Sequence, residues 1–396
     1  MPLNEAAIVE ILRRGVSGGA SDVHLKVGEP PLYRVSGSLH MAPNVPPLTP
    51  DDTRQIGAIL LTRAGYTFKV DQVREFDFAY SADKLGRFRV NMFRSRGSFG
   101  LVLRIIPTSP PTLDDLIMPP ALKELAVVPR GMILVTGATG SGKSTTLAAM
   151  IDRINRKRRC HILTIEDPIE YLHPHRSASV SQREVGTDTQ NFMSAFRGAL
   201  RQDPDVILVG EMRDQETMEM ALKAAETGHL VLSTLHTTDT IKSINRMLAF
   251  FDAKAQSEVR QRIADTLSSI VCQRLVKRAD TGGRIAACEV LVATPAVREA
   301  IRDPSKGAAL SELQESGESY GMQTFDQHII RLYSDGVLSE EVAREASTSA
   351  SNFDRNLGIL NAERQLAREK AAMGATAGDP ASEDIPGFQR GSNLDD

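Results

Sequence analysis

The chain has 396 residues, of which 41% are hydrophobic and 24% are charged. A chain of this length and composition can bury the apolar cores of two or three domains, which argues against a wholly disordered protein. Its formal net charge of −3 favours neither a nucleic acid nor an anionic membrane as a partner, so such a partner would need a local basic patch.

Cysteine usage and hydropathy indicate a cytoplasmic protein. The three cysteines, Cys160, Cys272 and Cys288, lie far apart and form no C-x-x-C pair. This spacing predicts neither a disulfide framework nor a four-cysteine zinc site, and it fits a reducing compartment. No stretch approaches the roughly 20 apolar residues that would cross a bilayer, and residues 1–15 lack the apolar core of a signal peptide. We therefore expect no membrane span.

The first third of the chain changes its hydrophobic period after one helix. Residues 4–16 have the spacing of a short amphipathic helix, with Asn4 as its cap. Residues 21–40 and 75–107 then alternate apolar and polar side chains between Gly and Pro turns, which predicts antiparallel strands. We predict a small mixed α/β domain over residues 1–107 and a proline-rich linker over residues 108–120.

From residue 121 onward, short apolar runs alternate with helical patterns, which predicts an α/β domain built on a parallel sheet. The pattern beyond residue 255 is mainly helical. We assign residues 121–365 to this domain with C-terminal helices. The polar, Gly- and Pro-rich residues 366–396 are predicted to form a disordered tail. The expected buried strands are residues 132–135, 162–165, 206–209 and 230–232, and the clearest helices are residues 145–156 and 191–201.

A glycine-rich stretch, GATGSGKST, satisfies G-x-x-x-x-G-K-[ST] between a predicted strand and a predicted helix. Backbone N–H groups at such a helix N-terminus favour phosphate. Lys143 should reach the β- and γ-phosphates of ATP, and the Ser144 hydroxyl should bind Mg²⁺. The residues predicted to bind the nucleotide are Gly137, Ala138, Thr139, Gly140, Ser141, Gly142, Lys143, Ser144 and Thr145.

Acidic residues follow two of the predicted strands. Glu166 and Asp167 end the stretch ILTIED, and Glu211 follows VILVG. The carboxyl ends of parallel strands meet at the ligand crevice, so we expect both glutamates near the phosphates. Hydrolysis needs one carboxylate near Mg²⁺ and another that orients or deprotonates the attacking water. We assign Glu211 to Mg²⁺, because it follows a wholly apolar strand, and Glu166 to the water, with an exchange of these roles as the alternative.

Two histidines flank the last predicted strand. His236 follows this strand, where a sensor of the γ-phosphate would lie, whereas His229 precedes it. A hydrogen-bonded structural histidine is the alternative interpretation, and it weighs more for His229 than for His236.

Four segments resemble those of one family, the secretion ATPases of type II secretion and type IV pilus systems, and within it the pilus retraction ATPases. They are GATGSGKS, ILTIEDPIEYLH, DPDVILVGEMRD and TGHLVLSTLHTTD, in the family's order. Residues 21–37 and 86–93 are similar to the family's PAS-like N-terminal domain. Residues 294–303 resemble a segment that the family associates with retraction, and the whole resemblance covers residues 3–350.

The resemblance implies a RecA-like P-loop ATPase core that follows a smaller PAS-like α/β domain, and a homo-hexameric ring with ATP between the domains. It implies Glu166 as the catalytic glutamate, Glu211 as the acid at the metal, and both histidines near the nucleotide. The implied activity is ATP hydrolysis that powers pilus retraction and twitching motility. The implied partners are an inner-membrane pilus platform protein and a paralogous retraction ATPase.

Arginines of the N-terminal domain are implied to approach the phosphates, where cationic groups stabilise the transition state of phosphoryl transfer. The candidates are Arg89, Arg96 and Arg104, with Arg94 as the alternative to Arg96. Exposed strand arginines without this function are the simpler interpretation.

Several alternative functions share parts of this sequence pattern. Within the family, the chain could be an accessory retraction ATPase, or an assembly ATPase, although it lacks the tetracysteine motif and longer N-terminal region typical of assembly ATPases. Outside the family, a nucleic-acid translocase or an ATP-binding scaffold would share the phosphate loop. The basic run at residues 155–159 suits the end of a helix, and no aromatic residues accompany it, so we expect no nucleic acid partner.

Overall fold

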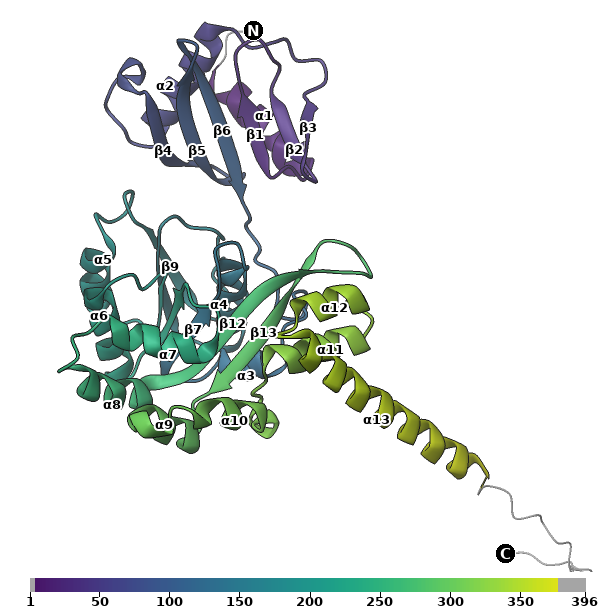
Figure 1. Cartoon of the computed structure of the whole chain (residues 1–396). Coiled ribbons are helices and arrows are strands. Elements are labelled where there is room, and N and C mark those ends of the chain that lie inside the picture. Colours follow the sequence, from purple (N-terminus) through teal and green to yellow (C-terminus); the bar gives the residue numbers. More distant parts are fainter. Residues whose placement is uncertain (1–3, 377–396) are drawn as a thin grey trace, which may run out of the picture. The chain divides into compact units, whose positions relative to one another are not determined.

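The computed structural model describes residues 4–376. The chain divides into a compact unit that ends at Thr324 and another that begins at Phe325. The first unit holds two separate sheets, one on each side of residue 107 (Figure 1). None of the helices among the described residues is long and apolar enough to cross a bilayer.

The N-terminal domain is built on a six-stranded antiparallel sheet with the order β3-β2-β1-β6-β5-β4. The predicted helix at residues 4–16 is α1, and the Asn4 side chain accepts a hydrogen bond from the backbone of Ala7, as expected for its cap. The elements are α1 (Glu5–Ser17), β1 (Asp22–Leu25), β2 (Leu32–Val35), β3 (Ser38–Met41), α2 (Pro50–Arg63), the 3-10 turn η1 (Val70–Gln72), β4 (Glu75–Ala82), β5 (Gly86–Ser95) and β6 (Ser98–Ile106).

The two faces of this sheet differ, as the alternating sequence predicts. On β5, Phe88, Val90 and Met92 are fully buried in a core shared with α1 and α2. Arg89 alternates with these buried residues, so it lies on the other face of the strand, where it is exposed. Arg104 on β6 lies directly across from it. The helix-free face of the sheet therefore presents guanidinium groups.

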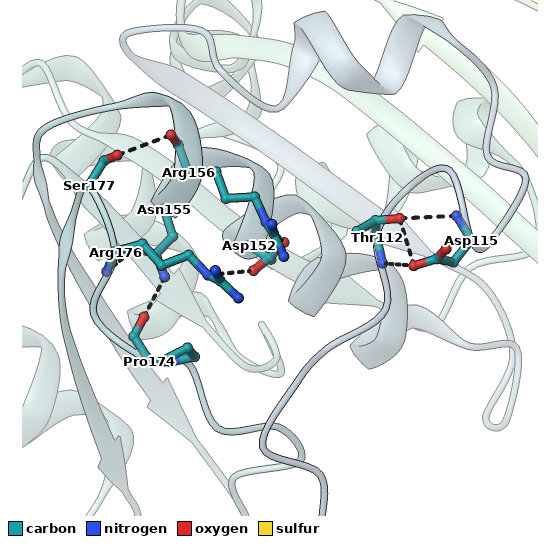
Figure 2. Close-up of polar contacts among 8 residues, drawn as sticks. All are labelled: Thr112, Asp115, Asp152, Asn155, Arg156, Pro174, Arg176 and Ser177. Atoms are coloured by element: carbon teal, nitrogen blue, oxygen red, sulfur yellow. Dashed lines mark hydrogen bonds and ion pairs between the residues drawn. The ribbon is translucent and has the colours of Figure 1, made fainter.

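The predicted linker, residues 108–120, is only partly extended. Leu113 and Met118 are buried in a core with α4 (Lys143–Lys157) and β7 (Gly131–Thr136), because both side chains are apolar. A turn forms between them, in which the Thr112 hydroxyl and backbone N–H both donate to Asp115 Oδ2 (Figure 2). Leu113 and Met118 thus tie the segment to the core of the second sheet.

The second sheet has seven strands in the order β13-β12-β7-β11-β10-β8-β9. All neighbours are parallel except β12 and β13. Each predicted buried run falls within a strand. The elements not yet given are α3 (Ala121–Leu125), β8 (His161–Glu166), β9 (Ser179–Glu184), α5 (Phe192–Ala199), β10 (Val206–Val209), α6 (Gln215–Glu226), β11 (Leu230–Leu235), α7 (Thr240–Ala249), α8 (Gln256–Thr266), β12 (Leu267–Lys277), β13 (Arg284–Val292), α9 (Pro295–Arg302), η2 (Pro304–Lys306), α10 (Ala309–Glu315) and η3 (Glu318–Tyr320).

This sheet is buried on both faces, which explains its continuous apolar runs. Along β10, Ile207 and Val209 join the core with α5, α6 and α7, whereas Val206 and Leu208 join the core with α4. Helices lie on both faces of this sheet (Figure 1). The carboxyl ends of β7, β8, β10 and β11 therefore meet at one edge.

The expectation of a mainly helical region beyond residue 255 is wrong for residues 267–292. They form the β12–β13 hairpin, whose register runs from Ser269 opposite Val292 to Lys277 opposite Arg284. The buried strands lack strict polar alternation, so their apolar runs resemble buried helix in a single sequence. The β-branched residues and the Gly282–Gly283 turn, where both φ angles are positive, were the available signal.

The unit beyond Thr324 is helical. It comprises α11 (Phe325–Ser334), α12 (Glu340–Ala346) and α13 (Ala350–Thr376). Residues 366–376, which we placed in a disordered tail, belong to α13, and residues 377–396 lie outside the described part of the chain.

Candidate nucleotide site

The phosphate loop joins the end of β7 to the start of α4, as the motif requires. Gly137 has φ 142°, and a Cβ atom there would lie 2.3 Å from the backbone oxygen of Gln273. Gly142, with φ 91°, directly precedes the first residue of α4. Only glycine accepts both the positive φ and the close approach, so the loop can turn its N–H groups toward an anion.

Lys143 is the only loop side chain with a positive charge. Its ammonium group donates to the backbone oxygens of Gly137, at 2.9 Å, and Ala138, at 3.1 Å. Burial lowers the pKa of Lys143, and the charge of Glu211 opposes this shift. The ammonium is held within the loop, where a phosphate would complete its coordination.

Glu166 ends β8, and two side chains donate hydrogen bonds to the same oxygen of its carboxylate. Oε1 accepts hydrogen bonds from Thr164 Oγ1, at 2.6 Å, and Gln182 Nε2, at 3.2 Å. Burial raises the pKa of Glu166, and hydrogen bonds from Thr164 and Gln182 oppose this effect. A carboxylate with a raised pKa is a stronger base, so it is better suited to accept a proton during catalysis.

Glu211 lies just beyond β10 and contacts two cationic or ionisable side chains. His236 Nε2 is 3.2 Å from Oε1, and Arg213 Nε is 2.8 Å from Oε2. His236 follows β11, the neighbouring strand, so the sheet places both side chains at the same edge. The sequence analysis expects each of these two residues at the ligand crevice, and the structure shows that their side chains contact each other.

A cleft of about 780 Å³ opens at this edge, a volume suited to a small organic ligand. Its lining brings together groups from four strand ends. The predicted site residues along it are Thr139, Gly140, Gly142, Lys143, Ser144, Thr145, Glu166, Glu211, His236 and Arg104.

His229 lies at the other end of β11, and its placement does not fit a role in this cleft. Its Nδ1 is 2.9 Å from the backbone oxygen of Ala224 and 3.2 Å from Thr227 Oγ1, at the end of α6. The six residues of β11 separate it from His236, a distance of roughly 20 Å along an extended strand. The structural alternative that we weighed for His229 agrees with these contacts.

The candidate arginines occupy different ends of the N-terminal sheet. Arg104 lines the cleft and donates from Nε to Asp22 Oδ1 at 3.0 Å. Arg89 is exposed opposite Arg104, whereas Arg96 lies at the β5–β6 turn with φ 51°. Arg94 donates to the backbone oxygens of Val73, Asp71 and Gly97 and lies over the Phe99 ring, so its guanidinium stabilises the domain.

Four polar residues of the site were not identified from the sequence. Tyr171 OH is 3.1 Å from Thr145 Oγ1, and Gln273 Nε2 donates to the backbone oxygen of Ser141 at 2.7 Å. Thr164 and Gln182 contact Glu166. Thr164 shares a strand face with Glu166, a period-two signal that could have identified it. Gln182 and Gln273 lie on β9 and β12, which we did not predict as strands.

Phosphate loop, strand order and strand-end carboxylates together define an α/β nucleotide-binding protein of the P-loop class. The family described as "Type II/IV secretion system protein" matches residues 72–298. The chain belongs to this family, whose fold is RecA-like, and the small N-terminal domain with its own sheet agrees with the predicted fold class.

Known relatives extend the match over most of the chain. The chain is 45% identical to "Type IV pilus retractation ATPase PilT" of Pseudomonas aeruginosa over 348 residues, covering 87% of this chain and 99% of that protein. It is 42% identical to "Type IV pilus ATPase PilU" of the same organism, covering 87% and 89%. A crystal structure of "the Pilus Retraction Motor PilT and Bound ADP" has a TM-score of 0.78 at 42% identity, covering 88% of this chain and 99% of that one.

Proposed function

We propose that this protein is an ATP-hydrolysing motor that powers type IV pilus retraction. The observation that carries the proposal is the convergence of Lys143, Glu166, Glu211 and His236 on one cleft at the strand ends. The similarity to proteins named as the pilus retraction ATPase and as an ADP-bound retraction motor supports the same function. A phosphate loop alone would support only nucleotide binding.

The proposed reaction is the attack of water on the γ-phosphate, which yields ADP and phosphate. The loop N–H groups and the Lys143 ammonium bind and orient the phosphates. Glu166 accepts the proton of the attacking water, since its raised pKa brings it nearer to neutral pH. His236 and Arg213 hold the Glu211 carboxylate in place.

Mg²⁺ fits the side chains of this cleft. Its protein ligands are usually one or two oxygens, with phosphates and water completing the octahedron. The described residues contain no cluster of three or more His, Cys, Asp or Glu side chains that could hold a metal alone. The Ser144 hydroxyl and Glu211 would hold Mg²⁺ together with the phosphates, and the ion would neutralise charge on them.

We further propose that the motor is a homo-hexamer that works on the cytoplasmic side of the inner membrane. Its partner would be a platform protein of the pilus machine, which the N-terminal domains would turn as ATP is hydrolysed. In this arrangement Arg104, Arg89 or Arg96 would approach phosphates from the N-terminal domain.

Glu166→Gln tests the chemical assignment. This substitution keeps the size of the side chain but removes the base, so ATP binding should stay within about threefold while hydrolysis falls at least a hundredfold. Nucleotide binding and phosphate release from the purified whole chain give the two values. Wild-type hydrolysis in this variant would sink the role that we give to Glu166.

The accessory retraction ATPase is the second candidate, because identity to PilU is nearly as high as identity to PilT. Deletion of the gene, followed by counts of surface pili and assays of twitching, separates the functions. Excess pili without twitching are expected for the principal retraction motor, and retained twitching for the accessory one. Loss of pili altogether would indicate an assembly ATPase.

A further inference from the structure

One amide side chain joins the carboxylate of Glu166 to the loop that follows β8. Gln182 on β9 donates from Nε2 to Glu166 Oε1, at 3.2 Å, and to the backbone oxygen of Tyr171, at 2.9 Å. Its Oε1 accepts from the backbone N–H of His173, at 2.8 Å. Both donors and the acceptor of the amide are therefore used, which fixes its orientation.

The loop itself is anchored to α4, the helix that begins at the phosphate loop. Asn155 Nδ2 donates to the backbone oxygen of Pro174 at 2.7 Å, and Asn155 Oδ1 accepts from the Arg176 N–H at 3.2 Å. The Arg176 guanidinium also reaches the buried carboxylate of Asp152, at 3.4 Å, and Ser177 Oγ donates to the backbone oxygen of Arg156 (Figure 2). Asn155 and Asp152 are almost wholly buried, so the side chains that α4 contributes to these contacts are shielded from water, whereas the Ser177 contact is exposed.

These contacts form a continuous connection from the phosphate loop to Glu166. It runs along α4 to Asn155, through residues 174–177 to Tyr171 and His173, and through Gln182 to the carboxylate. The Thr164 hydroxyl donates to the same Oε1 from within β8. Both side-chain donors bind Oε1, and the Glu170 backbone also donates a hydrogen bond to the carboxylate. The proton of an attacking water would pass to Oε2, the oxygen that these two side chains do not contact.

We propose that Gln182 is a positioning residue for ATP hydrolysis, which fixes Glu166 relative to the phosphate loop so that Oε2 faces the attacking water. This inference rests on the proposed role of Glu166 as the base. Gln182 itself touches no phosphate in this account and acts only through Glu166. Displacement of the base steeply lowers the rate of proton transfer, because this transfer requires a narrow range of distance and angle.

Gln182→Met tests the proposal in the purified whole chain. Methionine is similar in size but donates no N–H hydrogen bond, so kcat should fall on the order of tenfold with KM for ATP nearly unchanged. Loss of a donor to the charged carboxylate should also move the acid limb of the kcat–pH profile to higher pH. A merely structural role would leave that limb in place.

Two further variants keep the test decisive. Thr164→Val removes the other donor to Oε1, and it should shift the acid limb in the same direction even if Gln182→Met does not fold. Ser181→Ala is the matched control on β9, since Ser181 Oγ contacts His161 Nε2 instead, at 3.0 Å, and it should keep both kcat and the limb.

Failure of the role of Gln182 and failure of the role of Glu166 give different results. The positioning role would be overturned if Gln182→Met folds and keeps both its kcat and its acid limb. If Gln182→Met does not fold, the same result in Thr164→Val would overturn it. Wild-type hydrolysis in Glu166→Gln would instead overturn the base itself. In the double variant with Glu166→Gln, Gln182→Met should cause no further loss, and an independent tenfold loss would contradict action through Glu166.

Discussion

His229 and His236 belong to one sequence segment but have different surroundings. His236 contacts the Glu211 carboxylate in the cleft, whereas His229 contacts the backbone of α6 at the far end of the same strand. A strand of this length keeps its two ends apart whatever the side chains are. Function therefore has to be assigned to each histidine separately.

Substitution of the two histidines should separate their roles. His229→Ala should keep kcat within about twofold and lower stability by about 1 kcal/mol, because it loses one hydrogen bond at the α6–β11 connection. His236→Ala should lower kcat at least tenfold, because Glu211 loses a partner that holds it. Steady-state hydrolysis and thermal unfolding of both variants provide the comparison, and a larger loss of kcat in His229→Ala would refute the structural assignment.

The pH dependence of kcat should report Glu166. Burial raises the pKa of Glu166 above its ordinary value of 4.5, and the neighbouring Glu170 carboxylate acts in the same direction. The protonated acid cannot accept a proton from water, so activity should be lost as pH falls through a value above 4.5. Rates of hydrolysis measured at decreasing pH, with circular dichroism to confirm folding, test this expectation. A kcat that stayed constant down to pH 4.5 would contradict it.

The residues that we propose to bind the phosphates and Mg²⁺ could be named from the sequence because the chemistry restricts their types and spacing. Lys143, Ser144 and Glu211 follow directly from the loop motif and from an acid after an apolar strand. Gln182 and Gln273 reach Glu166 and the phosphate loop through side-chain amides that the pairing of β9 and β12 brings into place. A lone glutamine carries no sequence pattern, so residues of this kind emerge only from the fold.

At the scale of elements, the β12–β13 hairpin was the main feature missed. Pairing of β12 with β7 places Gln273 beneath the phosphate loop, where its amide fixes the Ser141 carbonyl. The hairpin extends the parallel sheet by an antiparallel strand, which no periodicity of the apolar residues indicated. Parallel strands with helices between them were predictable because both faces of the sheet are covered.

The helix α9 lies within residues 294–303, the segment that resembles one the family associates with retraction, and its arginines contact α8. Val297 and Ile301 are fully buried, as expected from their shared face. Arg298 donates to the backbone oxygens of Ala264 and Asp265 at the end of α8, and Arg302 pairs with the Asp265 carboxylate. A cation at the C-terminal carbonyls of a helix stabilises it.

Arg298→Ala should therefore destabilise the ATPase domain by about 1–2 kcal/mol, because two carbonyl contacts at a helix end are lost. Arg302→Ala is the control, since its more exposed ion pair should contribute less than about 1 kcal/mol. Chemical unfolding of the whole chain, followed by circular dichroism, measures the difference. Equal stability of Arg298→Ala and the parent chain would mean that α9 does not hold α8.

For the whole molecule, the types of domain could be predicted from the sequence more accurately than the domain boundaries. The N-terminal sheet and the P-loop sheet follow from different hydrophobic periods on either side of the proline-rich segment. Leu113 and Met118 within that segment pack on the second core, because burial of apolar side chains outweighs a proline-rich composition. The long helix α13 likewise extends into residues whose composition suggested a tail.

The motor that we propose is a ring of copies of this chain that hydrolyses ATP. Measurement of ATPase activity together with the mass of the active species tests it most directly. We expect ATP-dependent phosphate release by a species of six chains. A monomer that binds ATP without hydrolysing it would contradict the motor and leave only a nucleotide-binding protein.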